Sequence, residues 1–121
     1  MKTAAELSAK FLRKELYVVR TRPVVPREKL ETLLAEHLEH QIRLEKSGVL
    51  FAAGPLFDQQ GSNVGGQIIV RARSFDEAKA IADSDPFHKA GFRSYTIERW
   101  SMNEGRISIT LDYSDQSMNI E

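Results

Sequence analysis

The residues from 27 to 48 have the apolar spacing of one amphipathic helix, and the side of it expected to be buried contains two polar residues. The apolar positions are Leu30, Leu33, Leu34, Leu38 and Leu44. His37 and Gln41 fall near the middle of the same side. A buried polar group without a partner costs about 1–3 kcal/mol, so the fold must provide a partner for His37.

The sequence Asp83-Ser84-Asp85-Pro86 contains a candidate partner, because it ends a second expected helix. Two helices on the same face of a sheet would bring Asp85 next to His37. A carboxylate beside an imidazole holds one tautomer of the ring and favours its protonated form. Such a pair is typical of general acid or base catalysis, and we expect His37 and Asp85 to be catalytic residues.

Each of these residues also has a purely structural interpretation. His37 could be a core histidine satisfied by one hydrogen bond, and Asp85 could cap a short helical turn that begins at Pro86. His88 in that turn is expected to line the same pocket, whereas His40 is expected to face solvent. A metal site of His37, Asp85 and His88 has no HxH or HExxH spacing to support it, so no metal is expected.

The composition excludes several classes of function. The 121 residues suffice for one domain with a sizeable core. Lys plus Arg and Asp plus Glu both total 17, and the basic residues are scattered, which argues against nucleic-acid and anionic-membrane partners. There is no cysteine for a disulfide or a thiolate metal site. Residues 1–15 lack the apolar core of a signal peptide, and no stretch could span a membrane, so we expect a cytoplasmic protein.

The periodicity of the remaining sequence predicts the elements that position these residues. Strands are expected at Leu16–Arg20, Val49–Ala53, Gln67–Ala72 and Ser94–Trp100. The helix over 27–48 and a helix from Phe75, opened by a capping box at Ser74 and Glu77 and ended by Pro86, separate them. This order predicts a single α+β domain, 1–121, whose core at 16–104 has the ferredoxin-like βαββαβ fold with an antiparallel sheet.

Two further segments and one loop complete the prediction. An amphipathic helix is expected over 3–13 and an extra strand over 106–112, with a loosely held polar tail from Tyr113. The glycine-rich segment Gly61–Gly66 lies between two strands and not before a helix. It therefore favours a hairpin loop that folds over a pocket, not a phosphate-binding loop.

The second face of such a sheet predicts self-association. Two helices cover only one face, and the other face carries large apolar side chains that would be exposed in a monomer. We therefore expect a homodimer formed back to back through the sheet. The zero formal charge is compatible with this assembly.

The sequence resembles the YCII-related proteins, small dimeric α+β barrel proteins similar in fold to muconolactone isomerase. The resemblance covers roughly residues 16–104. It is carried by Glu36-His37-Leu38, Gly48 to Pro55, Gly65-Gly66, Asp83 to Phe87 with Lys89-Ala90-Gly91, Tyr95-Thr96-Ile97 and Trp100. The helix over 3–13 and the strand over 106–112 depart from the shortest members of the family.

The resemblance implies an active site in which His37 and Asp85 lie in a pocket between helices and sheet. We expect the pocket to be lined by Gly54, Pro55, Phe87, His88 and Gln41 and to take a small molecule without a cofactor. One branch of the family resembles a dehydrochlorinase that acts on chlorinated hydroxyquinols. The first hypothesis is therefore a lyase or isomerase for a compact cyclic or aromatic substrate. The alternative is a non-catalytic dimeric binding or accessory module with a structural His-Asp pair.

Overall fold

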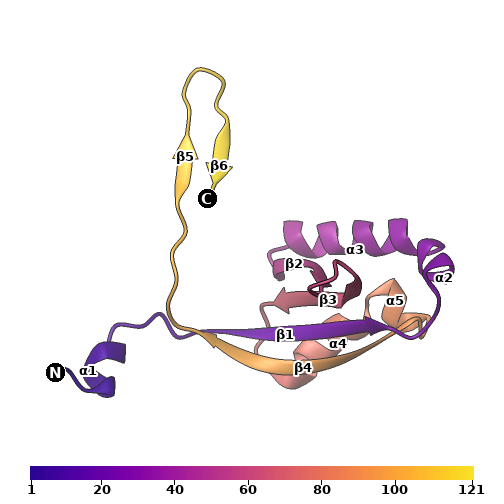
Figure 1. The fold of residues 1–121 in the computed structure, drawn as a ribbon, viewed down its shortest axis with the longest axis horizontal. Helices are drawn as coiled ribbons and strands as arrows, with labels where there is room; N and C mark the ends of the chain where they lie inside the picture. Colours follow the sequence, from indigo (N-terminus) through magenta and orange to yellow (C-terminus); the bar gives the residue numbers. More distant parts are fainter. The chain divides into compact units, whose positions relative to one another are not determined.

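The central sheet has four strands in the order β2-β3-β1-β4 (Figure 1). The computed structural model describes residues 1–121. In chain order the elements are β1 (Lys14–Pro23), α2 (Arg27–Glu31), α3 (Leu34–Lys46), β2 (Leu50–Phe57), β3 (Asn63–Val70), α4 (Phe75–Asp83), α5 (Pro86–Lys89) and β4 (Arg93–Met102). β3 runs antiparallel to both β1 and β2. The predicted ferredoxin-like fold is confirmed.

The hydrophobic core lies between the sheet and α4. In the register of β1 and β3, Tyr17 pairs with Val70 and Val19 with Ile68, so these four side chains share one face of the sheet. All four are buried, and together with Ala78 and Ala82 of α4 they form the core cluster. Ser74 caps α4 by accepting a hydrogen bond from the Glu77 amide at 3.1 Å, as the capping box predicts.

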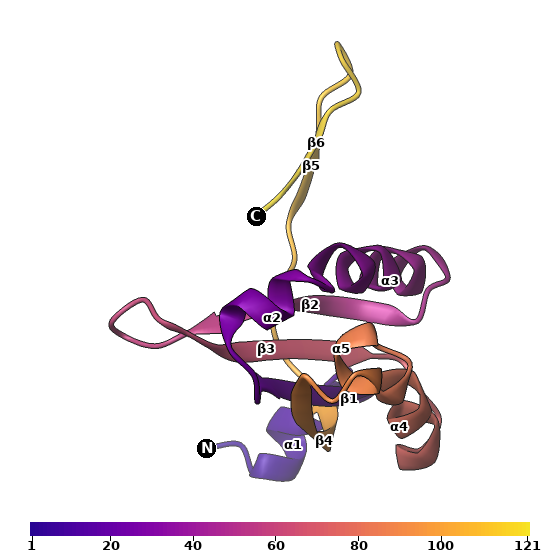
Figure 2. The ribbon, with the colours of Figure 1, turned by 90° about the vertical axis from the view of Figure 1, so that its right-hand side faces the viewer.

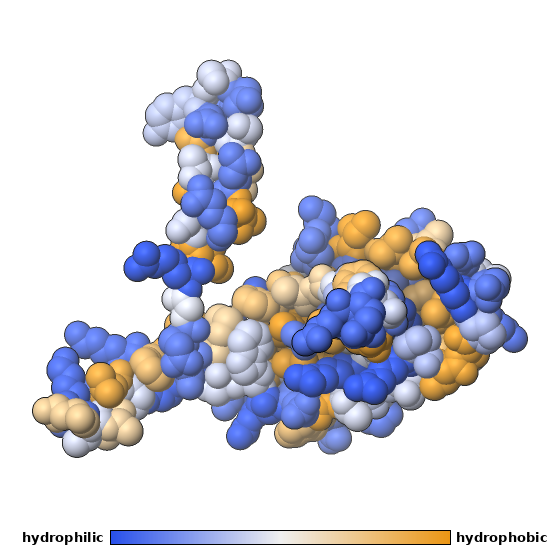
Figure 3. Space-filling view, in the orientation of Figure 1, coloured by the Kyte–Doolittle hydropathy of each residue, from blue (hydrophilic) through white to orange (hydrophobic).

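α3 lies along β2 (Figure 2) and has no fully buried side chain, whereas α4 buries Ala78 and Ala82. The half-buried residues of α3 include His37, Gln41 and Leu44. Leu34, Leu38 and Ile42 are 43%, 51% and 55% exposed, and Figure 3 shows an apolar patch over this helix. α3 therefore leaves open space beneath it, which the site occupies.

The helix predicted over 27–48 is interrupted, so that prediction is wrong in one detail. α2 ends at Glu31 and α3 begins at Leu34. Between them the Thr32 hydroxyl donates to the Lys29 carbonyl at 2.6 Å, which competes with continuation of the helix. The predicted end is correct, because Gly48 follows α3 with a φ of +80°.

The hairpin of β2 and β3 is longer than the sequence predicts. The sequence predicts the first strand over Val49–Ala53, but β2 continues through Gly54-Pro55 to Phe57, and β3 begins at Asn63. Pro55 fits because β2 lies at the edge of the sheet, where a missing backbone donor is tolerated. The connecting loop is therefore only residues 58–62.

The face of the sheet opposite the helices is less exposed than expected. Leu16, Val18 and Ile69 alternate with the core residues and therefore point to this face, yet they are only 0%, 8% and 7% exposed in the single chain. Trp100 on β4 is 37% exposed. The homodimer through this face stays a prediction, and less apolar surface is exposed there to support it than the sequence suggests.

Residues 1–13 and 102–121 form a separate compact unit. Its helix, α1, spans only Ala4–Ser8 and not 3–13, and the Arg13 side chain donates to the Ser8 carbonyl at 2.7 Å just past its end. The strand predicted over 106–112 is reduced to β5 (Ile109–Leu111). It pairs antiparallel with β6 (Met118–Ile120), in the tail that was expected to be loosely held. No helix of the chain is long and apolar enough to cross a membrane.

Candidate functional site

His37 and Asp85 form a hydrogen-bonded pair between two helices. Nδ1 of His37, on α3, lies 2.8 Å from Oδ2 and 3.0 Å from Oδ1 of Asp85, at the N-terminus of α5. The two side chains are 14% and 4% exposed. Because an ionised carboxylate only accepts hydrogen bonds, Nδ1 carries the proton, and Nε2 of a neutral ring keeps its lone pair. The imidazole also stacks on Phe87, with 4.5 Å between ring centroids.

The Asp85 carboxylate also caps α5, so both interpretations of this residue hold. Its Oδ1 accepts the backbone N–H of Phe87 at 2.8 Å. Burial opposes ionisation of the carboxyl, but the hydrogen bond and charge of His37, with the Phe87 amide, outweigh it, and the pKa of Asp85 is lowered. The carboxylate is therefore a fixed negative charge behind the imidazole.

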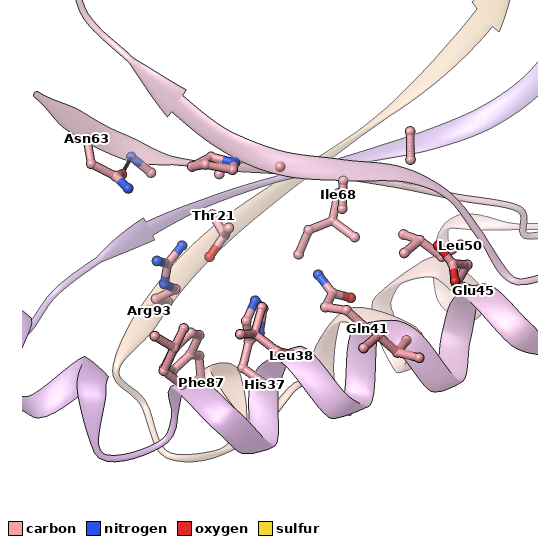
Figure 4. A pocket seen from close by; sticks show the side chains of 18 of the residues that line it. Thr21, His37, Leu38, Gln41, Glu45, Leu50, Asn63, Ile68, Phe87 and Arg93 are labelled. Atoms are coloured by element: carbon pink, nitrogen blue, oxygen red, sulfur yellow. Dashed lines mark hydrogen bonds between the residues drawn. The ribbon is translucent and has the colours of Figure 1, made fainter. Parts of the chain in front are cut away.

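A cavity of about 650 Å³ opens between α3 and the strands β2 and β3. Its walls are mainly apolar, with Leu34, Leu38 and Ile42 from α3 on one side and Ile68 on the other. Figure 4 shows the side chains of His37, Gln41, Thr21 and Arg93 gathered in this space. A mainly apolar cavity with a few convergent polar groups is the usual form of a small-molecule site.

The cavity brings together most of the residues expected to line it. Gln41, Gly54, Pro55 and Phe87 all do so, beside His37. His88 does not border this cavity. Its Nδ1 donates to the Ala82 carbonyl at 2.6 Å, and its Nε2 lies 2.9 Å from the Thr21 hydroxyl.

His88 is therefore held from both sides and joins α4 to β1, because Nδ1 carries the proton and Nε2 accepts from the Thr21 hydroxyl. No group of three His, Asp or Glu side chains in residues 1–121 is placed to hold a metal ion.

His40 is half-buried, contrary to the expectation that it faces solvent. The Ser84 hydroxyl donates to the Ile81 carbonyl at 2.5 Å, so it accepts from Nε2 of His40 at 3.0 Å. Burial lowers the pKa of His40, partly opposed by the charge of Asp85. His40 thus joins α3 to the end of α4.

Arg93, at the start of β4, also lines the cavity, although the sequence analysis did not single it out. Its guanidinium carbon lies 4.9 Å from the centre of the Phe87 ring. Burial lowers its pKa, and the charge of Asp85 opposes that effect. The alternation of Tyr95 and Ile97 would have indicated this residue, because Arg93 has the same parity and belongs to the same, core-facing side of β4.

Two glycines shape the side of the cavity formed by β3. Gly65 has a φ of +135°, and a Cβ there would lie 2.3 Å from the carbonyl oxygen of Thr21. At Gly66 a Cβ would lie 3.3 Å from the Thr21 methyl and 3.6 Å from a terminal nitrogen of Arg93. The glycine pair therefore allows β1 to approach closely and leaves room for the guanidinium.

These groups can move a proton within an apolar cavity. The free nitrogen of an oriented imidazole can accept a proton from a bound molecule, and the Asp85 carboxylate stabilises the imidazolium that results. The Arg93 guanidinium adds a positive charge at the same cavity. The arrangement suits acid-base chemistry on a small molecule.

Comparisons with known proteins identify the family and the fold. Among solved structures, the chain is similar to 5-chloro-2-hydroxyhydroquinone dehydrochlorinase (TftG) from Burkholderia phenoliruptrix AC1100, determined as a complex with 2,5-dihydroxybenzoquinone. The two share 24% sequence identity and a TM-score of 0.58, over 71% of this chain and 93% of the other, which is a likeness of fold. A comparison with curated proteins gave no match. The YCII-related domain matches residues 14–101, a stretch that includes β1, β2, β3, all of β4 but its last residue, and both His37 and Asp85. The chain therefore belongs to the family of YCII-related proteins.

Proposed function

We propose that this protein is a small-molecule lyase or isomerase in which His37 transfers a proton and Asp85 orients and stabilises its ring. The single observation that carries the proposal is the His37–Asp85 hydrogen bond of 2.8 Å at the wall of an apolar cavity. A histidine with only a structural role would not need to border a space of this size. The family supports the same class of chemistry, because a solved structure of similar fold is a dehydrochlorinase of an aromatic compound.

The proposed step begins with Nε2 of His37 unprotonated and facing the bound molecule. It accepts a proton from a C–H or O–H group, and the electron pair left on the substrate either expels a leaving group, as in a lyase, or shifts a double bond, as in an isomerase. Asp85 stabilises the imidazolium during this interval. The proton then returns to the substrate or passes to water, which restores the neutral ring.

The cavity favours a compact cyclic or aromatic substrate. Its volume of about 650 Å³ falls within the range of about 300–1,000 Å³ common for small-molecule sites. Leucine and isoleucine side chains of α3 face Ile68 and the glycine-rich part of β3 across it. A flat ring would fit between these walls, with its reacting edge toward His37.

Chloride release from 5-chloro-2-hydroxyhydroquinone under anaerobic conditions tests the proposal directly. We expect the unmodified protein to release chloride and His37→Gln to be slower by at least about 100-fold, the usual minimum for loss of a general acid or base. His40→Gln is the matched control, since it removes a histidine from the same helix that does not line the cavity. Equal rates for the protein and His37→Gln would disprove the role of His37.

The alternative is a binding or accessory module in which the pair only fixes helix packing. The observation in its favour is that Asp85 caps α5 while it binds His37. On that alternative, His37→Gln would lower stability but leave ligand binding and every measured turnover unchanged.

We also propose that the protein acts in the cytoplasm as a homodimer formed through the sheet face that carries Trp100. The partial exposure of this indole, 37%, supports the assembly. Sedimentation equilibrium should give a dimer for the protein and a weaker one for Trp100→Glu. A monomer at every concentration would contradict the proposal.

A further inference from the structure

The guanidinium of Arg93 lacks the partners that a half-buried cation normally has. It forms no ion pair and donates no hydrogen bond within the chain, and its Nε is buried without a partner. Its contact is with the face of the Phe87 ring, at 4.9 Å. The terminal nitrogens of the guanidinium point into the cavity (Figure 4), and buried polar groups are usually satisfied by protein or water, so these donors are available to a bound molecule.

The two carboxylates at or next to the cavity, Glu45 and Asp85, already have partners within the chain. Both oxygens of Asp85 accept hydrogen bonds, from His37 and from the Phe87 amide. Glu45, which lines the cavity, pairs with Lys46 at 3.7 Å. An acceptor for Arg93 must therefore come from outside the chain.

Gln41 contains a hydrogen-bond acceptor without a partner. Its Oε1 is buried and accepts no hydrogen bond, and its side chain lines the same cavity from α3 (Figure 4). In Figure 4 the amide nitrogen of Gln41 faces the cavity, and a half-turn of the amide would exchange it with Oε1. After that turn the cavity offers one donor with a positive charge and one neutral acceptor. A molecule that satisfies both has a negatively charged oxygen and an O–H or N–H group.

We propose that Arg93 binds an anionic oxygen of the substrate, as a carboxylate or an ionised phenol or enol, and that Gln41 accepts a hydrogen bond from a second, protonated group on the same ring. This inference rests on the proposed function for the identity of the site, and it adds the class of substrate. A single guanidinium matches a singly charged oxygen, and its planar N–H groups favour such acceptors.

The position of Arg93 also fits the proposed proton transfer. Phe87 contacts both groups, with 4.5 Å to the centroid of the His37 ring and 4.9 Å to the guanidinium carbon. When His37 removes a proton from carbon, the negative charge of the substrate grows by one, next to the anionic oxygen that Arg93 already binds. A cation held at that oxygen stabilises the charge as it forms. Arg93 is thus a substrate-binding residue that also stabilises the anion produced.

Binding of matched pairs of charged and neutral ligands tests this inference without any turnover. The probes are benzoate against benzamide, for a carboxylate, and 4-nitrophenolate against 4-nitroanisole, for a phenolate, each measured by isothermal titration calorimetry. We expect the charged member of at least one pair to bind about tenfold more tightly or better, a factor of ten being about 1.4 kcal/mol. The pair with the larger ratio identifies the source of the anionic oxygen.

Variants of Arg93 decide whether this residue causes the preference. Arg93→Gln should reduce the ratio to near one, and Arg93→Lys should keep part of it, because the charge remains but the planar geometry is lost. Arg99→Gln, an exposed arginine on the same strand, is the matched control and should leave the ratio unchanged. If Arg93→Gln does not fold, the partial loss in Arg93→Lys carries the test.

Two results would overturn the inference. One is equal binding of charged and neutral members by the unmodified protein, and the other is an undiminished preference in Arg93→Gln or Arg93→Lys. His37→Gln separates this inference from the proposed function. If this variant keeps the anion preference and unmodified turnover, the role of His37 fails and the ligand class stands.

Discussion

Nδ1 of His37 lies 2.8 Å from Oδ2 of Asp85, and this contact joins the first turn of α3 to the N-cap residue of α5. The carboxylate therefore has two tasks: it accepts a hydrogen bond from the imidazole, and it caps α5 by accepting the Phe87 backbone N–H. The two tasks need different chemical properties. The cap needs only an oxygen acceptor, whereas stabilising an imidazolium needs a negative charge.

Substitutions at Asp85 should separate these tasks. Asp85→Asn keeps an oxygen that can accept from Phe87 and from His37, so we expect a loss of stability below about 1 kcal/mol, since asparagine caps helices about as well as aspartate. Asp85→Ala loses the cap and leaves His37 unpaired, and should cost about 2–4 kcal/mol. Urea unfolding monitored by circular dichroism gives both values.

Activity should not follow this order of stability. Both variants lack the charge, so both should lose proton transfer by a similar factor although only Asp85→Ala is much less stable. The relevant measurement is chloride release at a temperature where both are folded. A nearly fully active Asp85→Asn would show that the charge is not used.

The stability of the protein should depend on pH through Asp85 in a definite direction. The folded-state pKa of Asp85 lies below the ordinary 3.8, so the unfolded chain takes up this proton more readily. The stabilisation is fully present above about pH 4 and is lost as the pH falls through the folded pKa. We expect the difference in unfolding free energy between the protein and Asp85→Asn to shrink as the pH is lowered from about 4 toward 2.

His40 should affect stability in a separate and higher pH range than Asp85. Its folded-state pKa lies below 6.5, so the unfolded chain is protonated first, and stability falls as the pH drops below about 6.5. His40→Gln should remove this component and leave the component of Asp85. If the protein and His40→Gln lose stability in parallel between about pH 6.5 and 5, the burial of His40 does not affect stability.

The sequence was informative about the His-Asp pair because each half has a local pattern. Helical spacing put His37 among leucines, and the Asp85-Pro86 dipeptide at a helix end placed the carboxylate. The order of helices and strands along the chain was then enough to predict the fold, and the observed strand order agrees with that prediction. Such local patterns are reliable because the periodicity of apolar residues determines which side of a helix is buried in the folded chain.

The rest of the site depends on contacts between distant elements. Arg93 shares the parity of Tyr95 and Ile97, which predicts its face of β4, but its place at the cavity depends on the pairing of β4 with β1. His88 looked suitable for the pocket, but Thr21 and the Ala82 carbonyl, from two other elements, hold it elsewhere. Hydrogen bonds between distant elements leave no periodic signal in the sequence.

Replacement by alanine should lower the unfolding free energy much more at Gly65 than at Gly54, although both glycines line the cavity. Gly65→Ala places a side chain in a conformation that only glycine adopts easily, against the Thr21 carbonyl, and should cost at least about 1–3 kcal/mol. Gly54→Ala is the matched control, because nothing lies within 4 Å of its Cβ position. It should change the unfolding free energy by no more than about 1 kcal/mol. Similar losses for both would show that β1 does not constrain Gly65.

Gln41→Leu should make the free protein more stable and the binding site less selective. Leucine has a similar size and no polar atom, so it removes the buried oxygen that has no partner, and we expect a gain of about 1 kcal/mol or more in unfolding free energy. The same change removes the acceptor for a substrate hydroxyl, so any preference for 4-hydroxybenzoate over benzoate should disappear. Gln59→Leu, an exposed glutamine in the β2–β3 loop, controls for the general effect of the substitution. A destabilised Gln41→Leu that still distinguishes the two ligands would mean that the oxygen is satisfied inside the free protein and does not contact the substrate. A binding site that keeps an unsatisfied polar group for its ligand loses stability for the sake of selectivity. Removal of that group should therefore raise the unfolding free energy and lower the selectivity.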